Sequence, residues 1–282
     1  MSNIINIINA GGTSATPLIL DLFPDTEYFY SLNRGGANTT DVVEGQKSGA
    51  VTENFTPEEL EDGTFATFAN GGEVRARTLY NQGTVNRPIE QTTFTDMPNL
   101  GNPSLYTFND RLFVSAQERN CFMESALATS ILDKDSTVYI TFRSQSAQNI
   151  GGVFESRQSS AQNRVVVYSD TRTSLFRYVN YAPSSTSNFI NFSAQQSVDT
   201  VRIYALRRTG NLVEAFDCNG FVGSVTSSDS FSVQTLLVLF RQTQGNLYFR
   251  GCFAELMIRE KSDSNTDLNA IIQNRKNYYS II

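Results

Sequence analysis

The feature that most constrains this chain is a long series of short segments in which apolar side chains recur at every second position. From about residue 105 onward, segments such as STVYITFR (136–143), TVRIYALRR (200–208) and TLLVLFR (235–241) are separated by Asn, Gly and Ser. A period of two is that of a strand with one buried face, and the polar interruptions supply turns. The series therefore predicts an all-β fold, an antiparallel β-sandwich of the jelly-roll type.

A hairpin is the clearest local signal within this series. Residues 211–225 read NLVEAFDCNGFVGSV, with two alternating segments around Asp217, Cys218, Asn219 and Gly220. An Asn-Gly pair readily supplies the positive φ values that a tight β-turn needs. We therefore expect two antiparallel strands that meet at this turn.

Short helices are expected at two places outside the strands. The segment 56–69 begins like a helix, with Thr56 as the N-cap and a proline at the first helical position, and Gly63 is expected to end it. The segment 266–279, TDLNAIIQNRKNYY, has an apolar stripe at helical spacing with Thr266 as the expected cap. The sandwich is thus predicted to carry few short helices, one of them at the C-terminus.

The amino-acid composition limits the chemistry that the chain can perform. It contains no histidine, which excludes a Ser-His-Asp triad, a Cys-His pair and a histidine-bound zinc site. The three cysteines, Cys121, Cys218 and Cys252, are far apart in the sequence. Three free thiols are therefore expected, with one disulfide and one free thiol as the alternative. On these grounds we assign no catalytic residue, no metal site and no cofactor.

The charge and the apolar runs of the chain bear on its partners. The net charge is −6, and lysine and arginine form no cluster, so we expect no nucleic-acid partner. No apolar run is long enough to span a bilayer, so we expect no membrane insertion. The N-terminus lacks the basic start and long apolar stretch of a secretory signal, which favours synthesis in the cytoplasm.

Three segments are expected along the chain. Residues 1–16, which alternate Asn and Ile, form either a loose terminus or an extended arm that pairs with a neighbouring subunit. Residues 17–100 form a first segment that packs onto a sandwich of residues 101–282. The apolar side chains expected to serve assembly are Ile4, Ile5, Ile7 and Ile8.

The segments of the C-terminal half occur in a recognisable order. STVYITFR comes first, GNLYFRGCFAELMIRE (245–260) follows near the end, and DLNAIIQNRKNYY (267–279) comes last. In this order they resemble the opening strand, the closing strand and the terminal helix of the concanavalin A-like lectin/glucanase superfamily, of the laminin-G-like kind. The resemblance implies that Gly251 lets two strands approach closely. It also implies that the closing strand packs inward around a local irregularity.

The first segment has a resemblance of its own. It contains EYFYSLN (27–33), ENFTPEELEDGTFATFA (53–69) and VRARTLYNQGTVNRPIEQ (74–91). These resemble the region that precedes such a sandwich in tailed-phage virion proteins and in the catalytic domain of α-L-arabinofuranosidase B-type enzymes. That region carries Trp-Tyr-Asp-Gln-Ser-Gly, whereas this chain reads LYNQG at 79–83 and lacks the Trp, the Asp and the Ser. The departure speaks against an enzymatic role.

Carbohydrate binding is a second kind of function to consider. It needs aromatic rings for the faces of sugars and amides or carboxylates for their hydroxyl groups. Tyrosines of the predicted strands lie near Asp170 and Asn180 in the sequence, although packing and interface roles are the alternative for them. The candidate glycan-binding residues are Tyr168, Tyr178, Tyr181, Asp217 and Asn219.

Two carboxylates on predicted strands give a third possibility, because glycosidases need a pair of carboxyl groups. Glu155 in GGVFESR and Glu214 in NLVEAFD could act as acid and nucleophile. We expect instead that both face solvent and pair with Arg157 or Arg207.

Together these observations predict a non-enzymatic structural protein of a tailed-phage particle. It would decorate the capsid or tail surface or form part of a fibre, anchored by its N-terminal arm. Its partners would be other virion proteins and further copies of itself. The alternative is a host-surface adhesin that binds polysaccharide through the sandwich, and a glycosidase of the arabinofuranosidase type is a less favoured reading.

Overall fold

The structure is a computed structural model, and it describes a defined part of the chain. The described residues are 16–37, 40–101, 104–116, 120–126, 131–132, 134–144, 150–157, 164–170, 175–181, 187–192, 200–226, 236–243 and 246–281. The assembly residues Ile4, Ile5, Ile7 and Ile8 lie outside them, and the arm stays a prediction.

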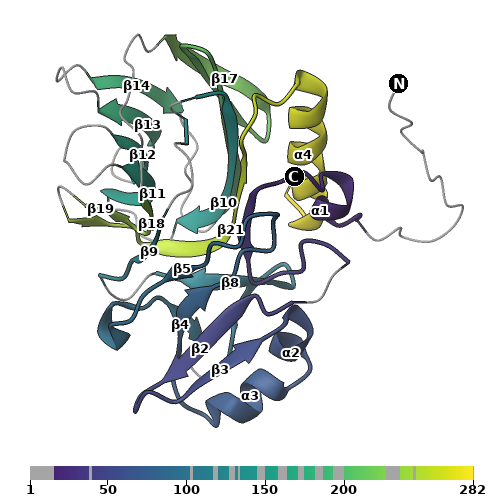
Figure 1. The fold of residues 1–282 in the computed structure, drawn as a ribbon, viewed down its shortest axis with the longest axis vertical. Helices are drawn as coiled ribbons and strands as arrows, with labels where there is room; N and C mark the ends of the chain where they lie inside the picture. Colours follow the sequence, from purple (N-terminus) through teal and green to yellow (C-terminus); the bar gives the residue numbers. More distant parts are fainter. Residues whose placement is uncertain are drawn as a thin grey trace, which may run out of the picture.

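Most of the strands form two facing antiparallel layers (Figure 1), which confirms the predicted all-β sandwich. The first layer contains, in order of neighbouring strands, β1 (Tyr28–Ser31), β21 (Gly251–Arg259), β10 (Ser136–Ser144), β15 (Val201–Thr209), β16 (Leu212–Asp217) and β17 (Gly220–Thr226). The second layer contains β5 (Ile89–Glu90), β9 (Met123–Ala126), β18 (Leu236–Leu239), β11 (Ile150–Arg157), β12 (Arg164–Asp170), β13 (Leu175–Tyr181) and β14 (Ser187–Phe192).

A further group of strands, in the lower part of Figure 1, joins the two layers. Its neighbouring strands are β3 (Thr52–Phe55), β2 (Val43–Lys47), β4 (Val74–Leu79), β6 (Asn99–Gly101) and β8 (Arg111–Ser115). β8 pairs with β21 and with β7 (Tyr106–Phe108), and β4 also pairs with β5. The short strands β19 (Arg241–Gln242) and β20 (Leu247–Tyr248) pair with each other beside β11.

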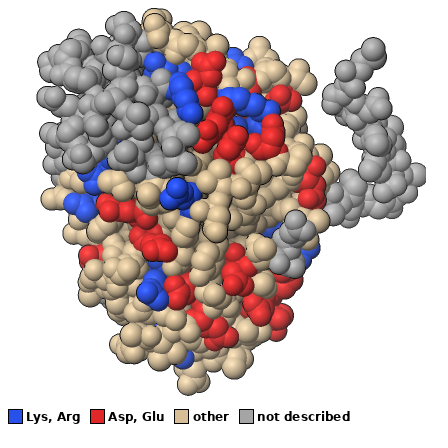
Figure 2. Space-filling view, in the orientation of Figure 1, with Lys and Arg blue, Asp and Glu red and all other residues tan. Residues whose placement is uncertain are grey.

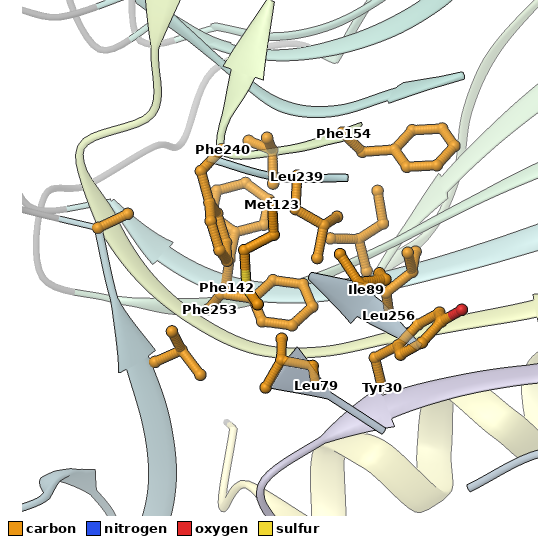
Figure 3. Close-up of a cluster of buried hydrophobic side chains, with 14 of the residues drawn as sticks. Tyr30, Leu79, Ile89, Met123, Phe142, Phe154, Leu239, Phe240, Phe253 and Leu256 are labelled. Carbon is orange, nitrogen blue, oxygen red and sulfur yellow. The ribbon is translucent and has the colours of Figure 1, made fainter. Parts of the chain in front are cut away.

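One continuous apolar core lies between these strands (Figure 3). Tyr30 and Leu79 from the first segment lie in the same cluster as Phe142 and Leu256 from the first layer and Phe154 from the second. All of them are almost completely buried, so the first segment and the sandwich share a hydrophobic core. The predicted boundaries at residues 16 and 100 stay a prediction.

Two helices cover the outer face of the first layer (Figure 1): α1 (Ile19–Leu22) and α4 (Asn265–Tyr278). Ile19 from α1 and Ile271 from α4 pack with Tyr139 and Met257 of the layer in a second apolar cluster. The C-terminal helix is therefore confirmed. Its N-cap is Ser264 and not Thr266, since the Ser264 hydroxyl accepts a hydrogen bond from the Asp267 backbone N–H at 3.1 Å.

The helical segment near residue 60 is confirmed as two short helices. α2 (Pro57–Glu61) begins with a capping box in which Thr56 and Glu59 exchange hydrogen bonds. Gly63 ends it with a φ of +102°, and α3 (Thr64–Ala69) follows. The remaining helical element is the 3₁₀ turn Phe94–Asp96.

The closing strand β21 has the two features expected of it. A Cβ at Gly251 would stand 2.2 Å from the Arg143 carbonyl oxygen, so only glycine fits this close approach. The pairing of β10 with β21 shifts register between Thr141 and Phe142, while Phe253 and Leu256 still point into the main core.

The hairpin of β16 and β17 forms as expected, around the predicted turn of Asp217, Cys218, Asn219 and Gly220. Asp217 pairs with Gly220, so Cys218 and Asn219 are the central residues. The positive φ value, +120°, belongs to Gly220 and not to Asn219. The Asp217 side chain accepts a hydrogen bond from the Asn219 N–H at 2.7 Å, and this bond stabilises the turn.

The state of the cysteines agrees with the expectation from composition. All three cysteines are free and buried, and burial raises the pKa of the Cys121 thiol to about 12. No helix among the described residues is both long and apolar enough to cross a bilayer. Figure 2 shows acidic and basic side chains interspersed over the described part of one face, without a continuous basic area.

Candidate functional site

A hollow of about 480 Å³ lies between α1 and the turn that follows β4. Its described walls come from three short parts of the chain that are far apart in the sequence: residues 20–26, residues 36, 37 and 40, and residues 81–84. We refer to this site as the hollow. Its lining residues are Leu20, Asp21, Pro24, Thr26, Gly36, Ala37, Thr40, Asn81, Gln82, Gly83 and Thr84.

The side-chain amide of Gln82 fixes one wall of the hollow. Its oxygen accepts a hydrogen bond from the Gly35 N–H at 2.8 Å. Its nitrogen donates to the carbonyl oxygens of Ser31 at 2.9 Å and Asn33 at 3.1 Å. All these partners are backbone groups of one segment, so Gln82 holds the path of residues 31–35.

Asn81 has the same role on the preceding residues. Its side-chain oxygen accepts from the backbone N–H groups of Phe29 at 2.6 Å and Gly83 at 3.0 Å. Its nitrogen donates to the carbonyl oxygens of Glu27, at 2.8 Å, and Val85. Asn81 is therefore saturated, and it positions the walls of the hollow.

The α1 side of the hollow is tied to the segment after Asn33. The Leu20 N–H donates to the Gly35 carbonyl oxygen at 2.8 Å, and Asp21 Oδ1 accepts from the Ala37 N–H at 3.0 Å. Gly36 lies between them, and a Cβ there would stand 3.3 Å from the Leu20 Cβ. These contacts hold the Asp21 carboxylate at the rim.

Three polar groups of the hollow remain available to a ligand. Asp21 Oδ2 and the hydroxyl groups of Thr40 and Thr84 make no hydrogen bond with any described residue. Thr26 differs, because its hydroxyl donates to the Phe23 carbonyl oxygen and accepts from Arg259. The hollow thus offers acceptors and hydroxyl donors beside the apolar side chain of Leu20 and the ring of Pro24, a mixture suited to a small polar ligand.

The tyrosines predicted to bind glycan lie on the second layer. Tyr168 on β12 is 4% exposed and packs with Val166 and Val179 in a small apolar cluster. Tyr178 and Tyr181 belong to β13, and their side chains lie outside the described part of the structure. The role of all three in glycan binding stays a prediction.

Asp217 and Asn219 lie at the tip of the β16–β17 hairpin, which belongs to the first layer. The structure therefore separates them from the β12 and β13 tyrosines by placing the two sets in different layers. Among the described residues, the side-chain hydrogen bond of Asp217 goes to the Asn219 N–H within the turn. Among the described residues, no group of three His, Cys, Asp or Glu side chains is close enough to hold a metal ion.

The two carboxylates considered for acid–base chemistry are both engaged in ion pairs. Glu155 is completely buried, not exposed to solvent as expected, and it pairs with Arg164 at 3.6 Å, whereas Arg157 or Arg207 was expected. Its other oxygen accepts two hydrogen bonds from Thr243. Glu214 pairs with Arg207 at 2.7 Å, which confirms the partner expected for it.

The fold defines a class: a two-layered antiparallel sandwich with an N-terminal group of strands built into its core. No protein-family model matches the chain, and no curated protein matches its sequence. Solved structures do match it. A GH54 α-L-arabinofuranosidase superposes with a TM-score of 0.65 over 91% of this chain and 63% of its own, at 12% identity.

Two further solved structures superpose on this chain, one of them much less closely. An arabinofuranosidase complexed with arabinofuranosyl-α-1,2-xylobiose gives a TM-score of 0.65 over 88% of this chain and 62% of its own, at 11% identity. The CBM40 of the Ruminococcus gnavus IT-sialidase, bound to α2,3-sialyllactose, gives a TM-score of 0.44 over 57% of this chain and 95% of its own, at 9% identity. A TM-score of 0.44 is too low to carry an argument. The chain spans less than two thirds of either arabinofuranosidase, and at these identities the likeness shows the fold alone.

The prediction that the chain is not an enzyme is wrong. It rested on the absent histidines and on the missing Trp, Asp and Ser of the first segment. Over 91% of the chain, the fold is similar to that of a GH54 α-L-arabinofuranosidase, at a TM-score of 0.65. Glycosidases work with two carboxyl groups and need no histidine, so the missing residues exclude particular mechanisms but not the class. None of these structures is a virion protein, and the comparisons give no support to a phage-particle role.

Sequence reasoning missed the residues of the hollow, although part of the signal was visible. The LYNQG motif at 79–83 carries both amides that position the walls. Asp21, Thr40 and Thr84 carry no local pattern of their own. They meet only because hydrogen bonds bring three distant segments together.

Proposed function

We propose that this chain binds carbohydrate, and that the hollow holds a sugar unit. The observation that carries the proposal is the set of unpaired polar groups in a hollow with rigid walls: Asp21 Oδ2 and the hydroxyls of Thr40 and Thr84. A sugar offers hydroxyl groups to such acceptors and donors, and its C–H faces suit Leu20 and Pro24. Because the walls are already ordered, binding costs little conformational entropy.

The fold supports carbohydrate as the ligand and suggests where to begin. Both arabinofuranosidases share the fold over most of this chain, and one is in complex with an arabinofuranosyl xylobiose. Arabinofuranosyl xylobiose and methyl α-L-arabinofuranoside are therefore the first probes. The volume of about 480 Å³ lies within the range of ordinary ligand sites.

Isothermal titration calorimetry with these two sugars and with arabinan and xylan fragments tests the proposal. We expect weak but saturable binding that Thr84→Ala lowers about fivefold or more, because one hydrogen bond to the ligand is lost. Thr92→Ala is the matched control, since Thr92 is an exposed threonine outside the hollow. Binding that Thr84→Ala and Thr92→Ala affect equally, or no binding of any probe, contradicts the proposal.

The same preparations show whether bond cleavage accompanies binding. Each oligosaccharide is incubated with the full chain, and the released sugars are quantified by chromatography. Release that requires the chain and that Thr84→Ala weakens in proportion to binding would place glycoside cleavage at this hollow. Release that Thr84→Ala leaves unchanged would place cleavage elsewhere on the molecule.

A second part of the proposal concerns where the chain binds sugar: on the surface of a phage particle. We propose that the chain is made in the host cytoplasm and displays its hollow on a virion, held by residues 1–16. The Ile-rich sequence of residues 4–8 and the resemblance of residues 27–91 support this. Deleting residues 1–16 is expected to abolish particle incorporation and to leave sugar binding intact. A truncated chain that still enters particles would exclude the arm.

A further inference from the structure

The hollow carries a charge that distinguishes one class of sugar from another. We infer that Asp21 sets the ligand class, so that the hollow accepts neutral sugars and rejects those that carry a carboxylate. This inference rests on the proposed function and makes it more specific.

The Asp21 carboxylate is held in a position from which it can accept hydrogen bonds from a ligand. Its Oδ1 is occupied by the Ala37 N–H at 3.0 Å, and α1 carries its backbone. Its Oδ2 has no partner among the described residues and belongs to the lining of the hollow. A carboxylate in this arrangement is an acceptor for the hydroxyl groups of a sugar and cannot donate to an acidic group.

No cation compensates for this charge within the hollow. Its described lining residues include no lysine and no arginine, and Asp21 is the one charged residue among them. Three cations of the neighbouring segments already have carboxylate partners, whereas Arg87, three residues after Thr84, has none among the described residues. Arg34 pairs with Glu58, while Arg259 and Lys261 both pair with Asp25.

The electrostatic consequence follows directly. A sugar carboxylate placed in the hollow would lie near the Asp21 carboxylate without a counter-ion, and like charges repel. Asp21 lies at an exposed rim, so solvent screens the repulsion and the effect is moderate. We expect a neutral sugar to bind about three- to tenfold more tightly than its carboxylated counterpart.

Matched pairs of sugars test this inference by calorimetry at low ionic strength. The pairs are methyl galactoside with methyl galacturonide, methyl glucoside with methyl glucuronide, and lactose with 3′-sialyllactose, with methyl α-L-arabinofuranoside as a further neutral probe. The expected result is a preference for the neutral member of each pair that binds, reduced at high salt. Acidic members that bind as tightly as neutral ones overturn the inference and leave the proposed function in place. If none of the seven probes binds, the inference fails; if arabinofuranosyl xylobiose and the arabinan and xylan fragments do not bind either, the proposed function fails with it.

Asp21→Asn provides the second arm of the test. Asparagine keeps an oxygen for the Ala37 N–H and removes the charge, so the fold is preserved. We expect this variant to lose most of its discrimination against the acidic sugars. Asp110→Asn is the matched control, because it makes the same change in net charge at an exposed position outside the hollow. Equal changes in discrimination in the two variants would show that the net charge of the chain, and not Asp21, sets the preference.

Discussion

The hollow and the junction between α4 and the first layer are held together by different chemistry. Around the hollow, the neutral amides of Asn81 and Gln82 bond to backbone groups. At the α4 junction, the Glu255 carboxylate accepts from Arg275 at 3.2 Å and from the Tyr279 hydroxyl at 2.9 Å, and each of these three residues is almost completely buried. Hydrogen bonds of the neutral Asn81 and Gln82 amides do not depend on pH or salt concentration. A buried carboxylate and a buried guanidinium stabilise the fold only while both are present.

The difference suits the two parts of the molecule. A hollow that receives a ligand gains from walls that stay fixed whatever the charge of the ligand or the salt concentration. A helix packed on the outside of a sheet needs only to stay in place, and a buried ion pair with an added tyrosine hydroxyl does this as long as every partner is present. Removing a single partner should therefore have unequal effects in the two regions.

The largest effect is expected at the α4 junction. Arg275→Ala leaves the Glu255 carboxylate buried without its cation, and both side chains are 1% exposed. We expect the free energy of unfolding to fall by about 3–5 kcal/mol, as measured by urea denaturation. The double variant Glu255→Leu with Arg275→Met should recover part of this loss. A single variant that loses less than about 1 kcal/mol would mean that the buried pair does not hold the helix.

An intermediate effect is expected at the hollow. Asn81→Ala removes the acceptor for the Phe29 and Gly83 N–H groups and the donor to two carbonyl oxygens. We expect a loss of about 2 kcal/mol in the free energy of unfolding, together with loss of sugar binding because the walls are no longer fixed. The stability change should be the same at low and high salt. If the loss in free energy of unfolding depended on salt concentration, charged groups and not the neutral amides would hold the walls of the hollow.

The local elements of both regions could be predicted from the sequence. The two-residue period gave the strands, and the capping residues gave α2. The sequence pattern predicts Thr266 as the N-cap of α4, two residues after the observed cap, Ser264. The spacing of Ser264 and Asp267, three residues apart, is typical of an N-cap and an acidic residue of the first helical turn. Two N-cap residues, Ser264 and Thr266, compete at this point, and only the backbone path into the helix decides between them.

The long-range features could not be predicted in this way. Asp21 reaches Ala37 across 16 residues, and Gln82 reaches Gly35 across 47. No periodic pattern encodes such pairs. They depend on the path of loops between elements, which local preferences leave open. The same holds for Glu155, which alternation placed toward solvent but which the structure buries against Arg164 and Thr243.

A smaller and pH-dependent effect is expected at Asp263, on the loop that leads into α4. Burial raises the pKa of Asp263 above its ordinary value, against the opposing effects of the Tyr139 hydroxyl and the Arg259 guanidinium. The folded state therefore binds its proton more tightly than the unfolded state. The contribution of this carboxyl to stability is largest below the ordinary aspartate pKa of about 4 and declines as the pH rises through the raised pKa.

Asp263→Asn tests this contribution, because asparagine cannot titrate. The difference in free energy of unfolding between the two proteins should change across this pH window and become constant above it, as measured by denaturation at a series of pH values. The expected direction is a decline for the wild-type chain relative to the variant as the pH increases. A difference that grows with pH would mean that the Arg259 pair, rather than burial, controls the carboxyl.

The smallest effect is expected at an exposed ion pair of the same junction, between Lys261 and Asp25. The two side chains are 46% and 55% exposed, so water and salt screen their attraction. Lys261→Gln should lower the free energy of unfolding by about 0.5 kcal/mol at low salt, and by less at high salt. The loss from Arg275→Ala should persist at high salt, because a buried carboxylate is beyond the reach of added ions. If the stability losses of the two variants showed the same salt dependence, burial would not explain why one ion pair of this junction contributes more to stability than the other.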